Sequence, residues 1–190
     1  MNTPNKLSLL RVMLIPVMVL LMYLPGWPMV LLSTAVFGAA AYTDYLDGHI
    51  ARRDGLVTDF GKFIDPVADK LLNLSAMIML TLPGLLPQWA VIVILARELA
   101  VDGLRMVAVG QGRVIAAGPL GKIKTVSQMV MILFLMLAGR LAPLFFPDVA
   151  VLLTAVDVLG WIMVLWVVVI TVWSGVDYFV RNFDCIRNAK

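Results

Sequence analysis

Residues 44–70 read DYLDGHIARRDGLVTDFGKFIDPVADK, a polar segment that joins two long apolar runs. It holds half of the chain's twelve acidic residues, namely Asp44, Asp47, Asp54, Asp59, Asp65 and Asp69. The chain around it is 62% hydrophobic and 14% charged, whereas soluble domains are typically about 25% charged. A chain this apolar with its carboxylates this concentrated predicts a membrane protein with a polar site at one edge of the bilayer.

Apolar stretches of about 18 residues or more recur from end to end, which is the length of helix that crosses a hydrocarbon core. Proline and glycine clusters such as PGWP, LPGLLPQ and RLAPLFFPD separate them. Six spans are predicted, at about 7–24, 29–50, 60–82, 88–109, 120–139 and 149–175. Because helices satisfy their own backbone polar groups in lipid, we expect an all-α integral membrane protein. It would form one domain over residues 1–190, with six transmembrane helices and a short interfacial segment at the N-terminus.

The placement of positive charge predicts how the chain lies in the membrane. Twelve of the fifteen lysine and arginine residues fall in the N-terminus, the 50–62 loop, the 105–124 connection and the C-terminal tail. Only Arg140 falls on the opposite side. Cytoplasmic loops carry such an excess, so we expect a multi-pass protein of the cell (inner) membrane with both termini cytoplasmic. The net charge of +3 does not indicate nucleic-acid binding, because the basic residues lie between apolar spans.

Four of the clustered aspartates have helical spacing. Asp44 and Asp47 are three residues apart at the end of one span, and Asp65 and Asp69 are four apart at the start of the next. The loop between them turns the chain back, so the two pairs can converge. Oxygen-rich clusters suit hard cations such as Mg²⁺ or Mn²⁺, and the sequence therefore predicts a metal site at the cytoplasmic boundary. The alternative is a rim of ordinary ion pairs with nearby cations (Arg52, Arg53, Lys62 and Lys70).

The same segment resembles the signature of the CDP-alcohol phosphotransferase family, D-x2-D-G-x2-A-R-x8-G-x3-D-x3-D. Every fixed position is filled, by Asp44, Asp47, Gly48, Ala51, Arg52, Gly61, Asp65 and Asp69. The resemblance implies an enzyme that transfers a group from a CDP-linked lipid to an alcohol, with two divalent cations, Mg²⁺ or Mn²⁺, as cofactors. It also implies a homodimer.

The resemblance further implies roles for individual residues. The four aspartates Asp44, Asp47, Asp65 and Asp69 would hold the metal ions, and Asp69 would also be the catalytic general base. The CDP-diacylglycerol would be bound by Asn5, Ser8, Gly48, Ala51, Arg52, Thr58 and Gly61. These roles agree with the chemistry, because the transfer needs neutralised pyrophosphate charge and a carboxylate within reach of the acceptor hydroxyl.

A second group of cations indicates the acceptor. Arg97 and Arg105 are eight residues apart and lie on one side of a helix, and Lys122 and Lys124 open the following span. Together they could form a pocket for a phosphate carried by the acceptor. The pattern ARE…LR…GKxKT resembles the branch of the family that uses sn-glycerol 3-phosphate. It implies transfer of the phosphatidyl group from CDP-diacylglycerol to that acceptor, with release of CMP.

Several alternatives stay open at this point. The lysines could simply follow the charge bias of cytoplasmic segments, and Arg97 could pair with Glu98 or Asp102. The acceptor could instead be inositol phosphate, or phosphatidylglycerol as in cardiolipin synthesis. From a different class, the four aspartates could serve a divalent-cation transporter, although they lie near one membrane face and no inverted repeat is visible.

Overall fold

The computed structural model describes residues 3–54, 59–113, 115 and 118–184, and within them the side chains of residues 8–43, 67–113, 115 and 118–184. All regular structure in these residues is helical, which confirms the predicted all-α class. The elements in chain order are α1 (Thr3–Tyr23), α2 (Trp27–Asp54), α3 (Asp59–Thr81), α4 (Gln88–Gly110), α5 (Pro119–Phe134), the π-helical turn η1 (Leu135–Gly139), α6 (Arg140–Phe145) and α7 (Ala150–Arg181). Each predicted span corresponds to one helix or, for 120–139, to α5 with η1.

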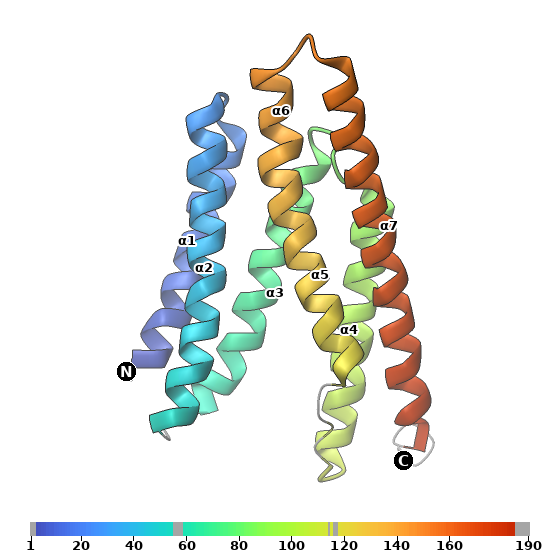
Figure 1. Ribbon diagram of the computed structural model, residues 1–190. Coiled ribbons are helices and arrows are strands. Elements are labelled where there is room, and N and C mark those ends of the chain that lie inside the picture. Colours follow the sequence, from blue (N-terminus) through green and yellow to red (C-terminus); the bar gives the residue numbers. More distant parts are fainter. Residues whose placement is uncertain (1–2, 55–58, 114, 116–117, 185–190) are drawn as a thin grey trace.

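The helices form two groups that share α3. Helix α1 packs against α2 and α3, while α7 packs against both α4 and α5. Helix α3 also contacts α4 and α5, so it joins the two groups. Figure 1 shows that α1 begins and α7 ends at the same end of the bundle. The end of α2 and the start of α3 lie at that end too, and these are the two helices that carry the aspartates of the acidic signature.

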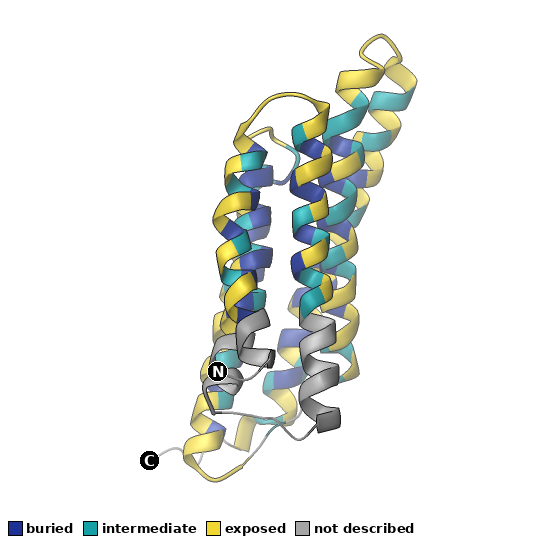
Figure 2. Cartoon of the chain, turned by 90° about the vertical axis from the view of Figure 1, so that its left-hand side faces the viewer, coloured by how far each residue is buried: buried dark blue, intermediate teal, exposed yellow. Residues whose placement is uncertain are grey.

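The interior is built from apolar side chains that point between the helices. Phe37 of α2, Leu80 of α3 and Met131 of α5 have no exposed surface, and Figure 2 shows buried residues on the inner faces with exposed ones outside. The outer surface is apolar as well, since Trp161 and Trp173 of α7 are half or more exposed. Exposed apolar surface of this extent is typical of a protein covered by lipid.

Among the described residues, two helical segments are long and apolar enough to cross a membrane. These are the continuous helix Pro119–Phe145, of 27 residues, and Ala150–Arg181, of 32 residues. Two shorter apolar stretches occur at Ser8–Tyr23 and Trp27–Thr43. The structure thus gives a helical protein in which two helices have the length and composition of membrane spans.

The fifth span continues further than the sequence predicts. The segment 140–148 was expected to separate two spans, yet the helix runs through Pro143 to Phe145. Proline has no N–H to donate to the carbonyl four residues earlier, here that of Gly139, and the π-helical turn lies directly before this last helical piece. Arg140 Nη2 also donates to the Met22 carbonyl at 2.9 Å, which ties α6 to the end of α1. A cation is favourable at a helix C-terminus, and this contact accounts for Arg140 on the otherwise cation-poor side.

Candidate active site

The signature residues sit on two helices that meet at one end of the bundle. Asp44 and Asp47 lie in α2, Asp65 and Asp69 lie in α3, and the two helices pack together. Several predicted site residues have side chains outside the described residues, or lie wholly outside them: Asn5, Asp44, Asp47, Gly48, Ala51, Arg52, Thr58, Gly61 and Asp65. Their roles stay predictions. Asp69 and Ser8 are described, and Ser8 is fully buried in α1.

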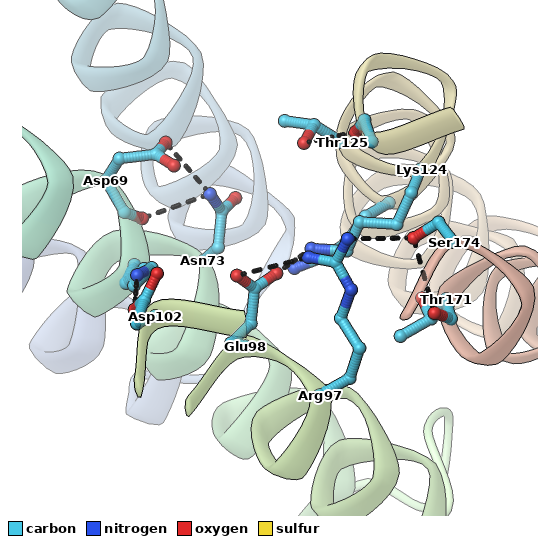
Figure 3. A network of polar contacts seen from close by, with 12 residues as sticks. Asp69, Asn73, Arg97, Glu98, Asp102, Lys124, Thr125, Thr171 and Ser174 are labelled. Atoms are coloured by element: carbon cyan, nitrogen blue, oxygen red, sulfur yellow. Dashed lines mark hydrogen bonds and ion pairs between the residues drawn. The ribbon is translucent and has the colours of Figure 1, made fainter. Parts of the chain in front are cut away.

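Asp69 is half-buried and is held by a residue one turn further along α3. Asn73 Nδ2 donates to Asp69 Oδ1 and to the Asp69 main-chain carbonyl, each at 3.0 Å, as Figure 3 shows. Asn73 itself is 7% exposed. A buried amide that bonds both the side chain and the backbone of its neighbour restricts the rotamers of that carboxylate. The orientation of Asp69 is therefore fixed by its own helix.

Asp69 lies on the wall of a cavity of about 550 Å³. Helices α3, α4, α5 and α7 and the residues just before α5 line it. Three of the four cations predicted for the acceptor, Arg97, Arg105 and Lys122, are on this wall. Helices α4, α5 and α3 thus bring the predicted base and most of the predicted phosphate-binding group to one cavity.

The other carboxylates on the cavity wall are each paired with a cation. Asp102 pairs with Lys70, which connects α4 to α3. Asp177 accepts from Arg181 Nε at 2.7 Å, within α7. Glu98 of α4 pairs with a lysine of α5, described below. These acids are neutralised locally, so they do not cancel the charge of the remaining cations.

Arg105 and Lys122 are available to bind an anion in the cavity, since neither forms an ion pair with a carboxylate within the part of the chain that the structure describes. Arg97 has one distant acidic neighbour, with its Nη1 3.8 Å from Glu98 Oε2. The wall carries four cations and four carboxylates, and three of these carboxylates are the paired ones described above. Arg97, Arg105 and Lys122, together with the Asp69 carboxylate, are suited to a ligand that carries a phosphate and a hydroxyl.

Lys124 occupies a different place from the other three cations. Its side chain is 5% exposed and pairs with Glu98, and it lines a smaller neighbouring cavity of about 50 Å³. That smaller cavity also includes Asp69 and Asn73. Figure 3 shows Lys124 and Arg97 reaching toward Glu98 from α5 and α4. Glu98 thus lies between two of the predicted acceptor-binding cations.

Helix α7 contributes residues that the sequence analysis missed. Ser174 Oγ accepts a hydrogen bond from Arg97 Nη2 at 2.8 Å. The Tyr178 hydroxyl accepts one from Arg105 Nε at 3.1 Å, and the Arg105 guanidinium carbon lies 5.5 Å from the centre of the Tyr178 ring. The sequence does contain a signal for these residues. Thr171, Ser174 and Tyr178 place polar groups on one face of an otherwise apolar helix.

Residues 1–173 match the family model described as CDP-alcohol phosphatidyltransferase. The chain belongs to this family of enzymes, which confirms the resemblance of residues 44–69.

Its relatives include a protein of Bacillus subtilis (strain 168) named CDP-diacylglycerol–glycerol-3-phosphate 3-phosphatidyltransferase. It is 40% identical over 201 residues, which cover 100% of this chain and 99% of that protein. A protein of the same name from Rickettsia typhi (strain ATCC VR-144 / Wilmington) is 36% identical over 179 residues, covering 94% of this chain and 95% of its own. Another from Salmonella choleraesuis (strain SC-B67) is 42% identical over 142 residues, covering 71% and 76%.

Proposed function

We propose that this protein transfers the phosphatidyl group of CDP-diacylglycerol to sn-glycerol 3-phosphate, giving phosphatidylglycerol phosphate and CMP. The observation that carries the proposal is the cavity in which Arg97, Arg105 and Lys122 lie with Asp69. An acceptor with its own phosphate needs such cations, whereas an uncharged alcohol does not. Relatives that bear the name of this activity match almost the whole chain.

The cavity side chains supply acceptor binding and proton removal. The cations hold the phosphate of glycerol 3-phosphate, so that its hydroxyl lies near Asp69. Asp69 takes the hydroxyl proton, the oxygen bonds to the phosphorus that bears diacylglycerol, and the bond from that phosphorus to the CMP oxygen breaks. Asn73 Nδ2 donates to Asp69 Oδ1, which restricts the orientation of the carboxylate at the cavity.

The proposed metal ligands are Asp44, Asp47, Asp65 and Asp69, with two ions, Mg²⁺ or Mn²⁺. Carboxylate oxygens are the donors that such hard cations prefer, and Asp69 presents one at the cavity on the helix that also carries Asp65. When bound, the ions neutralise the pyrophosphate and the leaving CMP. Asn5, Ser8, Gly48, Ala51, Arg52, Thr58 and Gly61 are proposed to bind CDP-diacylglycerol.

Lys124 is proposed to act on the acceptor through Glu98 rather than by contact. It neutralises the carboxylate that lies 3.8 Å from Arg97. With Lys124 in place, Glu98 competes less strongly with an acceptor phosphate for the Arg97 guanidinium.

We also propose six membrane crossings, with the active site at the cytoplasmic boundary, both termini cytoplasmic in the cell membrane, and assembly as a homodimer. The charge bias of the sequence supports this orientation. The positions of the start of α1, the end of α2, the start of α3 and the end of α7 at one end of the bundle support it as well.

The test is an acceptor panel with purified protein in detergent, CDP-diacylglycerol and Mg²⁺ or Mn²⁺, with CMP release as the readout. We expect turnover with sn-glycerol 3-phosphate and little with inositol phosphate or phosphatidylglycerol. Faster turnover with inositol phosphate or phosphatidylglycerol would show that the proposed acceptor is wrong. Metal uptake into vesicles without any CMP release would instead favour a transporter. Asp69→Asn should abolish turnover, and near-normal activity of this variant would contradict the role of Asp69 as base.

A further inference from the structure

We infer that Ser174, Gly175 and Tyr178 of α7 are positioning residues that bring the Arg97 and Arg105 guanidinium groups together on one acceptor phosphate. The inference rests on the proposed function, because it concerns how the acceptor is held. These α7 residues do not act on the reacting atoms. They set the geometry of two side chains that α4 supplies.

Helix α7 presents one buried face to α4. Thr171, Ser174, Gly175 and Tyr178 are all buried, and their spacing of three, four and seven residues places them on one side of the helix. Helices α4 and α7 pack together, and Figure 1 shows both running in the same direction. Arg97, which comes first in α4, therefore meets Ser174, which comes first in α7. Arg105 meets Tyr178 in the same way, further along both helices.

The two helices differ in how far apart they place these groups. Arg97 and Arg105 are eight residues apart, which is about 12 Å of rise along α4, whereas Ser174 and Tyr178 are four apart, or about 6 Å along α7. Each arginine bonds its own α7 hydroxyl. Both guanidinium groups are thus anchored to α7 by residues one turn apart, although more than two turns of α4 separate the arginines themselves. Anchoring of this kind favours one shared anion over two separate ones.

The Arg97 side chain is held at two points. Ser174 Oγ donates to the Thr171 carbonyl at 3.3 Å, which commits the hydroxyl hydrogen and turns a lone pair to Arg97 Nη2. Further back, the stem of Arg97 passes over Gly175, where an added Cβ would lie 3.0 Å from Arg97 Cγ. The glycine gives the arginine room to lie against α7, and Ser174 fixes its end.

Arg105 is held by the ring and the hydroxyl of Tyr178. The tyrosine is 7% exposed, and it takes only the Nε hydrogen of Arg105. The two terminal nitrogens of a guanidinium can bind a phosphate through two parallel hydrogen bonds. Tyr178 thus orients the group and leaves its phosphate-binding edge to the acceptor.

A purely structural role for this α7 face makes a different prediction. Buried polar groups need partners in any helix packing, so removing one would lower stability without selecting between substrates. A positioning role lowers affinity for the acceptor and leaves CDP-diacylglycerol unaffected. The two roles are separated by measuring ligand binding and the two KM values independently.

The experiment compares Ser174→Ala and Tyr178→Phe with Val172→Ala, a change on the exposed side of the same helix. Binding of sn-glycerol 3-phosphate and of inorganic phosphate is measured in detergent, from the rise in thermal stability with ligand concentration. We expect both α7 variants to bind both ligands with about tenfold lower affinity, since each variant loses a hydrogen bond to a charged group. We also expect an about tenfold higher KM for glycerol 3-phosphate with an unchanged KM for CDP-diacylglycerol. Tyr178→Leu, which also lacks the aromatic ring, should bind both ligands more weakly than Tyr178→Phe does.

The outcomes distinguish the inference from the proposed function. Ligand affinities of Ser174→Ala and Tyr178→Phe equal to that of Val172→Ala would overturn the inference, as would a wild-type protein that binds neither ligand. A wild-type protein that binds glycerol 3-phosphate but releases no CMP would overturn the proposed function and leave the binding result standing. If Ser174→Ala does not fold, Ser174→Cys keeps the volume and weakens the acceptor atom, and the same comparison applies.

Discussion

Neutralising either partner of the Glu98–Lys124 pair should have unequal effects on stability. The pair is buried, with side-chain exposures of 15% for Glu98 and 5% for Lys124. Glu98 has a second cation nearby, since its Oε2 lies 3.8 Å from Arg97 Nη1. Lys124 has no second carboxylate partner among the described residues. Glu98→Gln therefore leaves a buried ammonium with no ion-pair partner among the described residues and only the Asp69 carboxylate in the same small cavity. Lys124→Met leaves a carboxylate that still has Arg97 within 3.8 Å.

The size of the difference follows from these contacts. Removing one member of a buried ion pair costs about 3–5 kcal/mol, and we expect Glu98→Gln to cost about 3 kcal/mol because the amide oxygen can still accept a hydrogen bond. For Lys124→Met, the remaining attraction of Glu98 to Arg97 is about 4 kcal/mol before desolvation, at an effective dielectric constant of about 20. This attraction offsets part of the loss and reduces the cost to about 1.5 kcal/mol. For a chain of this size, 1 kcal/mol corresponds to about 2–4 °C.

The assay is the thermal unfolding midpoint in detergent, with Ile123→Met as the control on an exposed side of α5. We expect a fall of about 6–12 °C for Glu98→Gln and about 3–6 °C for Lys124→Met. The double variant should unfold at a higher temperature than Glu98→Gln alone, because neither buried charge of the pair is then left without its partner. Lys124→Met should also raise the KM for glycerol 3-phosphate, since Glu98 then draws Arg97 more strongly.

Two results would refute this reasoning. The first is a Lys124→Met variant that is as unstable as Glu98→Gln, which would mean that Arg97 gives Glu98 no support. The second is additive destabilisation in the double variant, which would mean that the two charges do not interact.

The remaining predictions concern the site itself. Arg105→Ala should raise the KM for glycerol 3-phosphate far more than that for CDP-diacylglycerol, and equal effects on both would contradict its place in the acceptor pocket. Asn73→Ala should lower kcat about tenfold with little change in either KM, because Asp69 loses the bond that orients it; an unchanged kcat would show that this bond is dispensable. Gly175→Ala places a methyl group 3.0 Å from Arg97 Cγ, so it should weaken glycerol 3-phosphate binding several-fold, and normal binding would mean that Arg97 shifts without consequence. Chelation of divalent cations should abolish CMP release, Mg²⁺ or Mn²⁺ should restore it, and full activity in chelator would contradict the metal site.

The helices and the family could be predicted from the sequence because both are encoded locally. Hydropathy and breaker residues mark helix bounds within a few positions, and the signature occupies one continuous segment. The exception is Pro143, where the helix continues through the proline directly after a π-helical turn. Such a turn depends on packing around residues 135–139 and leaves no mark in the local pattern.

The acceptor cations were only partly predictable for a different reason. Their residue types and spacing indicated a cationic group, but the sequence does not reveal which carboxylate on another helix each one meets. Lys124 is sequestered by Glu98, 26 positions away, while Lys122 is left facing the cavity. The contributions of Ser174 and Tyr178 were missed because hydropathy averages hide single polar side chains in a strongly apolar helix.

The sharing of the cavity among helices bears on how such an enzyme could acquire a new acceptor. The residues of the signature lie on α2 and α3, whereas the acceptor side of the cavity comes from α4, α5 and α7. Substitutions in the second half of the chain can therefore reshape the acceptor pocket while the signature residues stay intact. Gene duplicates could diverge in this half alone, and a designer could graft the last helices of one relative onto the first three of another. The Lys70–Asp102 pair, which connects α3 to α4, is the junction that such a chimera would have to preserve.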